Sequence, residues 1–224
     1  MAEPLTVVFD LDGTLVDSAP DLLDSLNSVL RRAGHRAVGP AELRHLVGHG
    51  VASLFERAFA LTGTLVSAVQ LAAYEREFLD HYGANIARKS RPFPHVMETL
   101  TLLADAGAKL GVCTNKPQGL ADALLAELDL ARYFAAVLGE GRARFNKPDP
   151  RHVLEVIDAL GGTRERAVMI GDSIVDVSAA RAAKIPVIAM SYGYTPTPVH
   201  ELGADAVADD FAALPELINF VRPS

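Results

Sequence analysis

Residues 7–17 read Val-Val-Phe-Asp-Leu-Asp-Gly-Thr-Leu-Val-Asp, and this stretch decides the fold. The apolar residues at its start predict a short buried strand that ends at a turn around Gly13. Asp10 and Asp12 therefore stand where the strand opens into a loop, which is where open α/β sheets bind ligands. Two carboxylates so close repel each other unless a cation or a shared proton compensates them. A hard divalent cation with oxygen ligands suits this pair.

The composition is that of an ordinary globular protein, with 224 residues, of which 50% are hydrophobic and 22% charged. The net charge of −7 provides no sequence-wide basic field for nucleic acid or for an anionic membrane surface. The single cysteine, Cys113, excludes an internal disulfide and suits a reducing cytosol. No signal peptide is recognisable, and no apolar stretch reaches the ~20 residues that span a membrane. A cytoplasmic enzyme is the default expectation, and the sequence does not predict an oligomeric state.

The pattern after the first strand changes to helical. Residues 17–34 begin with a capping residue and an early proline, continue with apolar residues at helical spacing and stop at Gly34. Further helices are expected at 40–47, 50–61 and 67–87. We find no convincing strand between Val16 and Arg91. This part of the chain is therefore expected to be an all-helical insert covering residues 17–88.

From residue 91 onward, apolar strands alternate with helices. The expected strands are residues 109–113, 136–138, 167–170, 187–189 and 206–208. Strands that alternate with helices imply a parallel sheet covered on both faces. We therefore expect an α/β fold, a Rossmann-like parallel core built from residues 1–16 and 89–224 and interrupted by the helical insert.

Four groups of polar residues stand at or near strand ends, and in a parallel sheet these ends share one edge. They are the Asp10/Asp12 pair and residues 114–116, 147–148 and 171–176. Asp10, Asp12 and Asp172 offer oxygen ligands for magnesium.

The other groups complete the same chemistry. The Thr114 hydroxyl and the backbone amides that follow it suit phosphate oxygens, and Lys147 supplies a positive charge near the metal. A metal, a cation and a carboxylate nucleophile together describe phosphoryl transfer through an aspartyl phosphate.

These motifs, in this order, resemble the haloacid dehalogenase superfamily of phosphatases over essentially the whole chain. Asp10-Leu11-Asp12-Gly13-Thr14 is similar to the first motif of that family. Thr114 with Asn115 stands at the second, Lys147 at the third, and Gly171-Asp172 with Asp176 at the fourth. The helical insert resembles the helical cap of the family.

The resemblance implies a role for each of these residues. Asp10 would be the nucleophile, and Asp12 would protonate the leaving group and then activate water. Magnesium would bind the Asp10 carboxylate, the Asp12 carbonyl and Asp172. Lys147 would neutralise developing charge, and Asp176 would orient Lys147 or a metal-bound water. Thr114 and Asn115 would bind phosphate, and His49 on the cap loop would contact a substrate carboxylate.

Within the superfamily, the residues most resemble the phosphoglycolate phosphatases, which implies 2-phosphoglycolate as the substrate. Asp12 argues against dehalogenases, and the absence of lysine between Val16 and Arg88 argues against phosphonate hydrolases. The helical insert contains no Lys/Arg-rich loop, which argues against sugar phosphomutases. Pyrophosphatases, sugar-phosphate phosphatases and nucleotidases of the same superfamily stay open. A catalytically inactive regulatory member is a remote alternative, since Asp10, Asp12 and Lys147 are all present.

Overall fold

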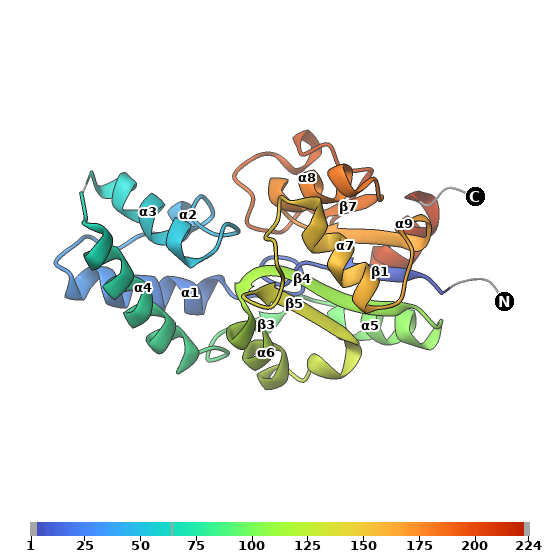
Figure 1. The fold of residues 1–224 in the computed structure, drawn as a ribbon, viewed down its shortest axis with the longest axis horizontal. Coiled ribbons are helices and arrows are strands. Elements are labelled where there is room, and N and C mark those ends of the chain that lie inside the picture. The colour runs from blue at the N-terminus through green and yellow to red at the C-terminus, as the bar shows by residue number, and fades with distance from the viewer. Residues whose placement is uncertain (1–3, 64, 222–224) are drawn as a thin grey trace.

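The computed structural model describes residues 4–63 and 65–221, and its centre is a six-stranded parallel sheet (Figure 1). The strand order is β5-β4-β1-β6-β7-β8. The bounds are β1 Thr6–Phe9, β4 Lys109–Pro117, β5 Ala136–Glu140, β6 Ala167–Gly171, β7 Val187–Met190 and β8 Ala206–Ala208. The predicted α/β class and all six predicted strands are confirmed. Strand β4 is longer than the predicted strand over 109–113, because its pairing with β5 continues to Pro117.

The first strand of the chain lies in the middle of the sheet. β1 pairs in parallel with β4 on one side and with β6 on the other, so that Phe9 stands opposite Val112 and Ile170. Every residue of β1 is buried. Strands buried on both faces read as continuous apolar runs, which is the pattern that the sequence shows here. The loops after these three strands therefore open side by side.

Helices cover both faces of the sheet. One face packs against α5, α6 and α9 through a cluster that includes Phe9, Leu100, Leu124 and Phe211. The other face packs against α7 and α8 through Val8, Val153 and Val177. The helix bounds are α5 Val96–Asp105, α6 Gln118–Glu127, α7 Pro150–Ala159, α8 Ile174–Ala183 and α9 Leu214–Val221.

Between residues 17 and 91, the described part of the chain forms four helices that stand together beyond one end of the sheet (Figure 1). They are α1 Ala19–Arg32, α2 Pro40–Leu43, α3 Val51–Thr62 and α4 Ala68–Gly83. The prediction of helix over 40–47 is wrong beyond Leu43, because the following residues form turns around Gly48, whose φ is 94°. The helix predicted over 67–87 ends at Gly83.

Two short connections join this helical segment to the sheet. β2, Val16–Asp17, pairs antiparallel with β3, Arg91–Pro92. The Asp21 carboxylate on α1 accepts hydrogen bonds from the backbone amides of Lys89 and Ser90 and from the Ser90 hydroxyl. These contacts hold β2 and the start of α1 against β3 and the residues that precede it.

Lys184 ends α8 in the left-handed conformation, with φ of 59°. Glycine is the usual residue at such a helix end, because a side chain is strained there. Among the residues that the structure describes, no helix is long and apolar enough to cross a membrane.

Candidate active site

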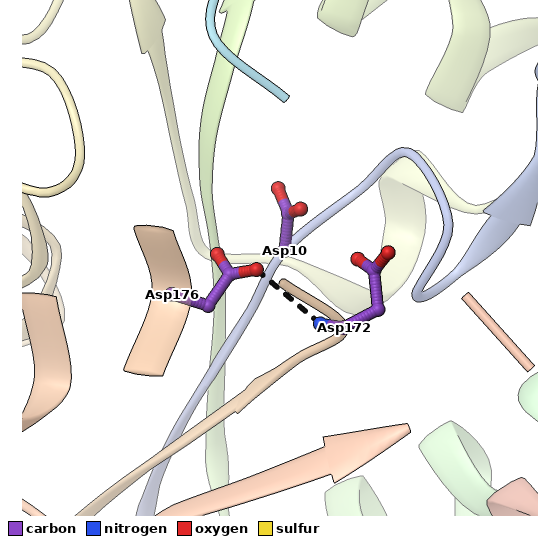
Figure 2. Close-up of side chains that lie close together, drawn as sticks. All are labelled: Asp10, Asp172 and Asp176. Carbon is purple, nitrogen blue, oxygen red and sulfur yellow. Dashed lines mark hydrogen bonds between the residues drawn. The ribbon is translucent and has the colours of Figure 1, made fainter. Parts of the chain in front are cut away.

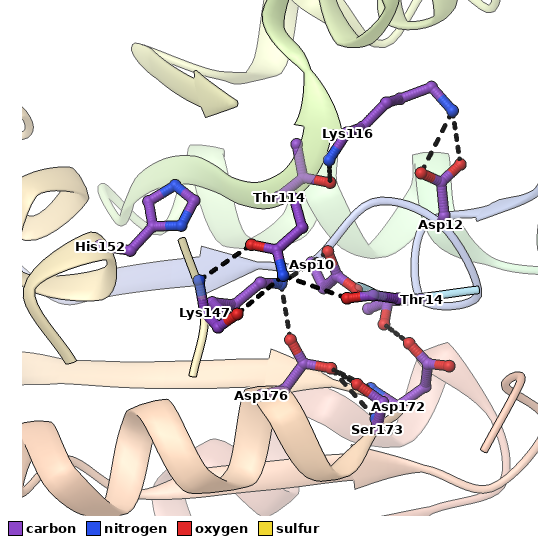
Figure 3. Close-up of polar contacts among 12 residues, drawn as sticks. Asp10, Asp12, Thr14, Thr114, Lys116, Lys147, His152, Asp172, Ser173 and Asp176 are labelled. Atoms are coloured by element: carbon purple, nitrogen blue, oxygen red, sulfur yellow. Dashed lines mark hydrogen bonds and ion pairs between the residues drawn. The ribbon is translucent and has the colours of Figure 1, made fainter. Parts of the chain in front are cut away.

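Most of the predicted site residues lie together at one edge of the sheet (Figure 3). Asp10 follows β1, and Asp172 follows β6. Thr114 and Asn115 lie near the carboxyl end of strand β4. Lys147 comes from the loop that precedes α7. Asp10, Thr114, Asn115, Lys147, Asp172 and Asp176 are all buried. Charged groups at this depth need partners, and the contacts between them define the site.

Lys147 is the central cation of the site. Its Nζ lies 2.8 Å from Oδ1 of Asp10 and 2.6 Å from Oδ1 of Asp176, and its side chain is 1% exposed. Burial lowers the pKa of Lys147, but Asp10 and Asp176 raise it further, so the net shift is upward. The lysine therefore stays charged, and it cannot act as an acid or base near neutral pH.

Three carboxylates gather around one point (Figure 2). One carboxylate oxygen from each of Asp10, Asp172 and Asp176 lies within 4.8 Å of the others. Burial, followed by the charge of Asp176, raises the pKa of Asp172 well above its usual range. The pKa of Asp10 is raised to about 7, because burial outweighs the opposing effect of Lys147. One lysine does not compensate this much negative charge, and a divalent cation is the natural counter-charge.

Asp172 is held in place from both sides. Its Oδ1 accepts a hydrogen bond from the Thr14 hydroxyl at 2.9 Å, and its Oδ2 accepts one from the backbone amide of Tyr194 at 2.7 Å. A Cβ on Gly193 would lie 2.1 Å from the Cβ of Asp172, so only glycine fits at this position. Each Asp172 oxygen keeps a further lone pair for a cation.

Asp176 has more hydrogen-bond partners than Asp172. Its Oδ1 contacts Lys147, and its Oδ2 accepts hydrogen bonds from the backbone amides of Asp172 and Ser173 and from the Ser173 hydroxyl. Asp176 is thus positioned to orient Lys147 and the loop of Asp172. The predicted outer role of Asp176 stays a prediction, since one of its oxygens also belongs to the three-carboxylate cluster.

The side chain of Asp12 points away from the three carboxylates. It accepts a hydrogen bond from the Ser18 hydroxyl, and its oxygens lie 3.0 and 3.2 Å from Nζ of Lys116. The same Nζ donates to the Tyr82 hydroxyl at 2.7 Å. Burial, followed by the Asp12 charge, raises the pKa of Tyr82 well above its usual value. Binding of a metal by the backbone carbonyl of Asp12 stays a prediction.

The residues after β4 serve the backbone as well as the site. The Thr114 hydroxyl accepts a hydrogen bond from the Lys116 amide at 3.1 Å. The Asn115 side chain accepts from the Lys147 amide and donates to the carbonyls of Lys147 and Gly48. Asn115 therefore fixes two loops against each other, and phosphate binding by Thr114 and Asn115 stays a prediction.

His49 is exposed, and the lining of the pocket described below does not include it. Its neighbours Gly48 and Gly50 do line that pocket. The cap loop that the sequence indicated thus reaches the site through its backbone. A substrate contact by the His49 side chain stays a prediction.

A pocket of about 70 Å³ lies between the carboxylates and the helical segment. Asp10, Asp12, Thr114, Lys116 and Lys147 line it from the sheet. The opposite wall is largely apolar and comprises Leu22, Val47, Val51, Leu54, Phe78 and Tyr82. The volume is far below the 300–1,000 Å³ of a typical ligand site, which favours a small substrate. Thr14, Tyr82, Lys116 and Tyr194 were given no role from the sequence alone.

Known proteins resemble this chain in sequence and in fold. A sequence model of the family described as haloacid dehalogenase-like hydrolase matches residues 7–190. A phosphoglycolate phosphatase of Agrobacterium fabrum is 47% identical over 92% of this chain and 89% of its own. One of Rhodospirillum rubrum is 42% identical over 98% and 93%. A crystal structure described as "a predicted phosphoglycolate phosphatase" from Haemophilus somnus superposes with a TM-score of 0.92 at 30% identity, covering 97% of this chain and 99% of that one.

Proposed function

The chain belongs to the haloacid dehalogenase-like hydrolase family, and from that premise we propose that it hydrolyses 2-phosphoglycolate to glycolate and phosphate with magnesium. The position of Asp10 supports this function most directly. Its carboxylate lies just beyond the carboxyl end of β1 and lines the pocket. It also contacts Lys147 and belongs to the three-carboxylate cluster. A nucleophile, a cation and a metal site thus meet where a small phosphate ester fits.

The residues present fit a magnesium ion. Asp10 and Asp172 offer free lone pairs, Asp12 would offer its carbonyl, and the pKa values of Asp10 and Asp172 are raised first by burial and then by the neighbouring carboxylates. Magnesium takes few protein carboxylates and keeps several waters. When bound, it would neutralise the phosphate oxygens and keep the Asp10 carboxylate ionised.

The reaction divides between the two aspartates. A carboxylate oxygen of Asp10 attacks phosphorus, the bond from phosphorus to the ester oxygen breaks, and Asp12 gives its proton to the departing glycolate oxygen. Asp12 then takes a proton from a water that attacks the phosphorus of the aspartyl phosphate, and Asp10 leaves with the electrons of its bond. Lys147 stabilises the charge on Asp10 and on the transferring group throughout.

The helical segment completes the proposed enzyme. We propose that residues 17–88 act as a cap over the core of residues 1–16 and 89–224. The apolar wall that they contribute would exclude water while the leaving group departs. A reducing cytoplasm suits the protein, because Cys113 is buried and has no second cysteine to pair with.

The test is a panel of phosphate esters assayed with magnesium and with EDTA. The proposal predicts that kcat/KM is highest for 2-phosphoglycolate, compared with pyrophosphate, a sugar phosphate and a nucleotide, and that EDTA abolishes turnover. Asp105→Asn, a change at an exposed site on α5, is the control and should keep the full rate. Hydrolysis that persists in EDTA, or a preference for another ester, would refute the proposal.

A further inference from the structure

The pocket contains two lysines, and they are not equivalent. Lys147 lies between two carboxylates, those of Asp10 and Asp176. Lys116 has one carboxylate partner, Asp12, and one neutral partner, the Tyr82 hydroxyl. Lys116 and Lys147 are the cations among the described residues that line the pocket. Lys116 therefore holds the positive charge that is least compensated within the pocket.

We propose that Lys116 and Tyr82 together bind the carboxylate of the substrate. This inference rests on the proposed function and names the part of the site that selects an acidic leaving group. Lys116 comes from the end of β4, and Tyr82 comes from α4 in the helical segment. The selecting group would thus be shared between the two parts of the chain.

Charge and burial favour this assignment. The Lys116 side chain is 3% exposed, yet it lines the pocket together with Tyr82, so its ammonium is withdrawn from bulk water. The ammonium has three N–H donors, and the Tyr82 hydroxyl, which accepts one of them and also hydrogen-bonds Ser18, can turn its own O–H toward a ligand in place of Ser18. A carboxylate in the pocket could accept from both groups. Elsewhere the wall is apolar, and a carboxylate left against it without a partner would be costly.

The start of α3 adds to this environment. Gly50, which precedes the helix, and Val51, its first residue, both line the pocket. Among the residues that the structure describes, no side chain caps this helix end. The unpaired backbone amides of a helix N-terminus favour negative charge. An anionic end of the substrate would therefore meet the helix start on one side and the Lys116 ammonium on the other.

A matched pair of substrates separates carboxylate recognition from a general role of Lys116 in positioning Asp12. The pair is 2-phosphoglycolate and its neutral amide, 2-phosphoglycolamide, which has nearly the same size. Lys116→Met deprives Asp12 of its partner for both substrates, so the ratio of the two kcat/KM values is the readout. The wild-type protein should prefer the acid, and the variant should lose that preference by at least about 30-fold.

Two further variants complete the experiment. Tyr82→Phe keeps the ring and removes only the hydroxyl, and it should lower the ratio by roughly 3- to 10-fold. It gives an independent answer if Lys116→Met does not fold. Lys109→Met, at the opposite end of β4, should leave the ratio unchanged, because that lysine contacts the Gly161 carbonyl.

The outcomes are distinct. Equal losses on the acid and the amide in Lys116→Met, or no loss on either, would overturn carboxylate binding. So would a wild-type protein that hydrolyses both substrates equally well, although the phosphatase activity would then stand. A wild-type protein that hydrolyses neither substrate with magnesium would overturn the proposed function itself.

Discussion

The carboxylate centre and the wall of the pocket are built in opposite ways. In the centre, Asp10, Lys147 and Asp172 come from loops of the sheet and Asp176 comes from the first turn of α8, and each side chain is fixed by contacts to other described residues. The wall comes mainly from the helical segment and is apolar apart from Tyr82. Reaction chemistry thus depends on a rigid set of charges, while substrate choice depends on few polar contacts. Changes in the two regions should have different consequences.

The largest effect is expected from Asp10→Asn. Without the nucleophile, kcat should fall by roughly 10⁴-fold or more. The stability of the metal-free protein should not fall, because the raised pKa of Asp10 means that its charged form is unfavourable in the fold. Steady-state kinetics and thermal unfolding in EDTA at pH 8 measure both quantities. A variant that keeps near-normal turnover would show that Asp10 is not the nucleophile.

Lys147→Met should damage stability as well as activity. The change leaves Asp10 and Asp176 buried without their shared cation, and the loss of one partner from such a pair costs about 3–5 kcal/mol. Denaturant unfolding without metal measures this loss. The double variant with Asp10→Asn should recover part of it. A loss below about 1 kcal/mol in the single variant would mean that the ion pairs are not important for the fold.

Magnesium should stabilise the folded protein through the carboxylate centre. At one hundred times its dissociation constant, the ion should add about 3 kcal/mol to the free energy of unfolding. Asp172→Asn should remove most of this gain, whereas the exposed Asp105→Asn should keep it. Thermal unfolding with and without magnesium tests both. An undiminished gain in Asp172→Asn would place the metal elsewhere.

The smallest effect concerns acid stability. Burial, followed by the charge of Lys147, lowers the pKa of His152 to about 4 from an ordinary value of 6.5. The neutral ring donates through Nε2 to the Leu138 carbonyl. A group with a lowered histidine pKa contributes stability above pH 6.5, and this contribution is lost as the pH falls toward 4.

Between pH 8 and pH 5 this loss should be about 2 kcal/mol. His152→Gln cannot protonate, so its stability should change less over the same range. Parallel pH profiles of unfolding for the wild-type protein and the variant provide the measurement. Identical profiles would show that His152 does not titrate as its burial implies.

Part of this contrast could be predicted from the sequence. Asp10, Asp172 and Lys147 stand at or near strand ends, and the parallel arrangement of strands brings those ends to one edge. The contact of Lys116 with Tyr82 could not be predicted in this way, because helical spacing marks Tyr82 only as part of α4. Strands β2 and β3 have two residues each, too few for any periodic pattern.

Asp10 should become phosphorylated during turnover. Asp12→Asn should still react with p-nitrophenyl phosphate, whose leaving group needs no proton, but it should release phosphate slowly. Rapid acid quenching of this variant with the ³²P-labelled ester should trap a phosphoenzyme that hydroxylamine cleaves. Peptide mapping should place the label on Asp10. No trapped label, or a label on a different residue, would contradict the account.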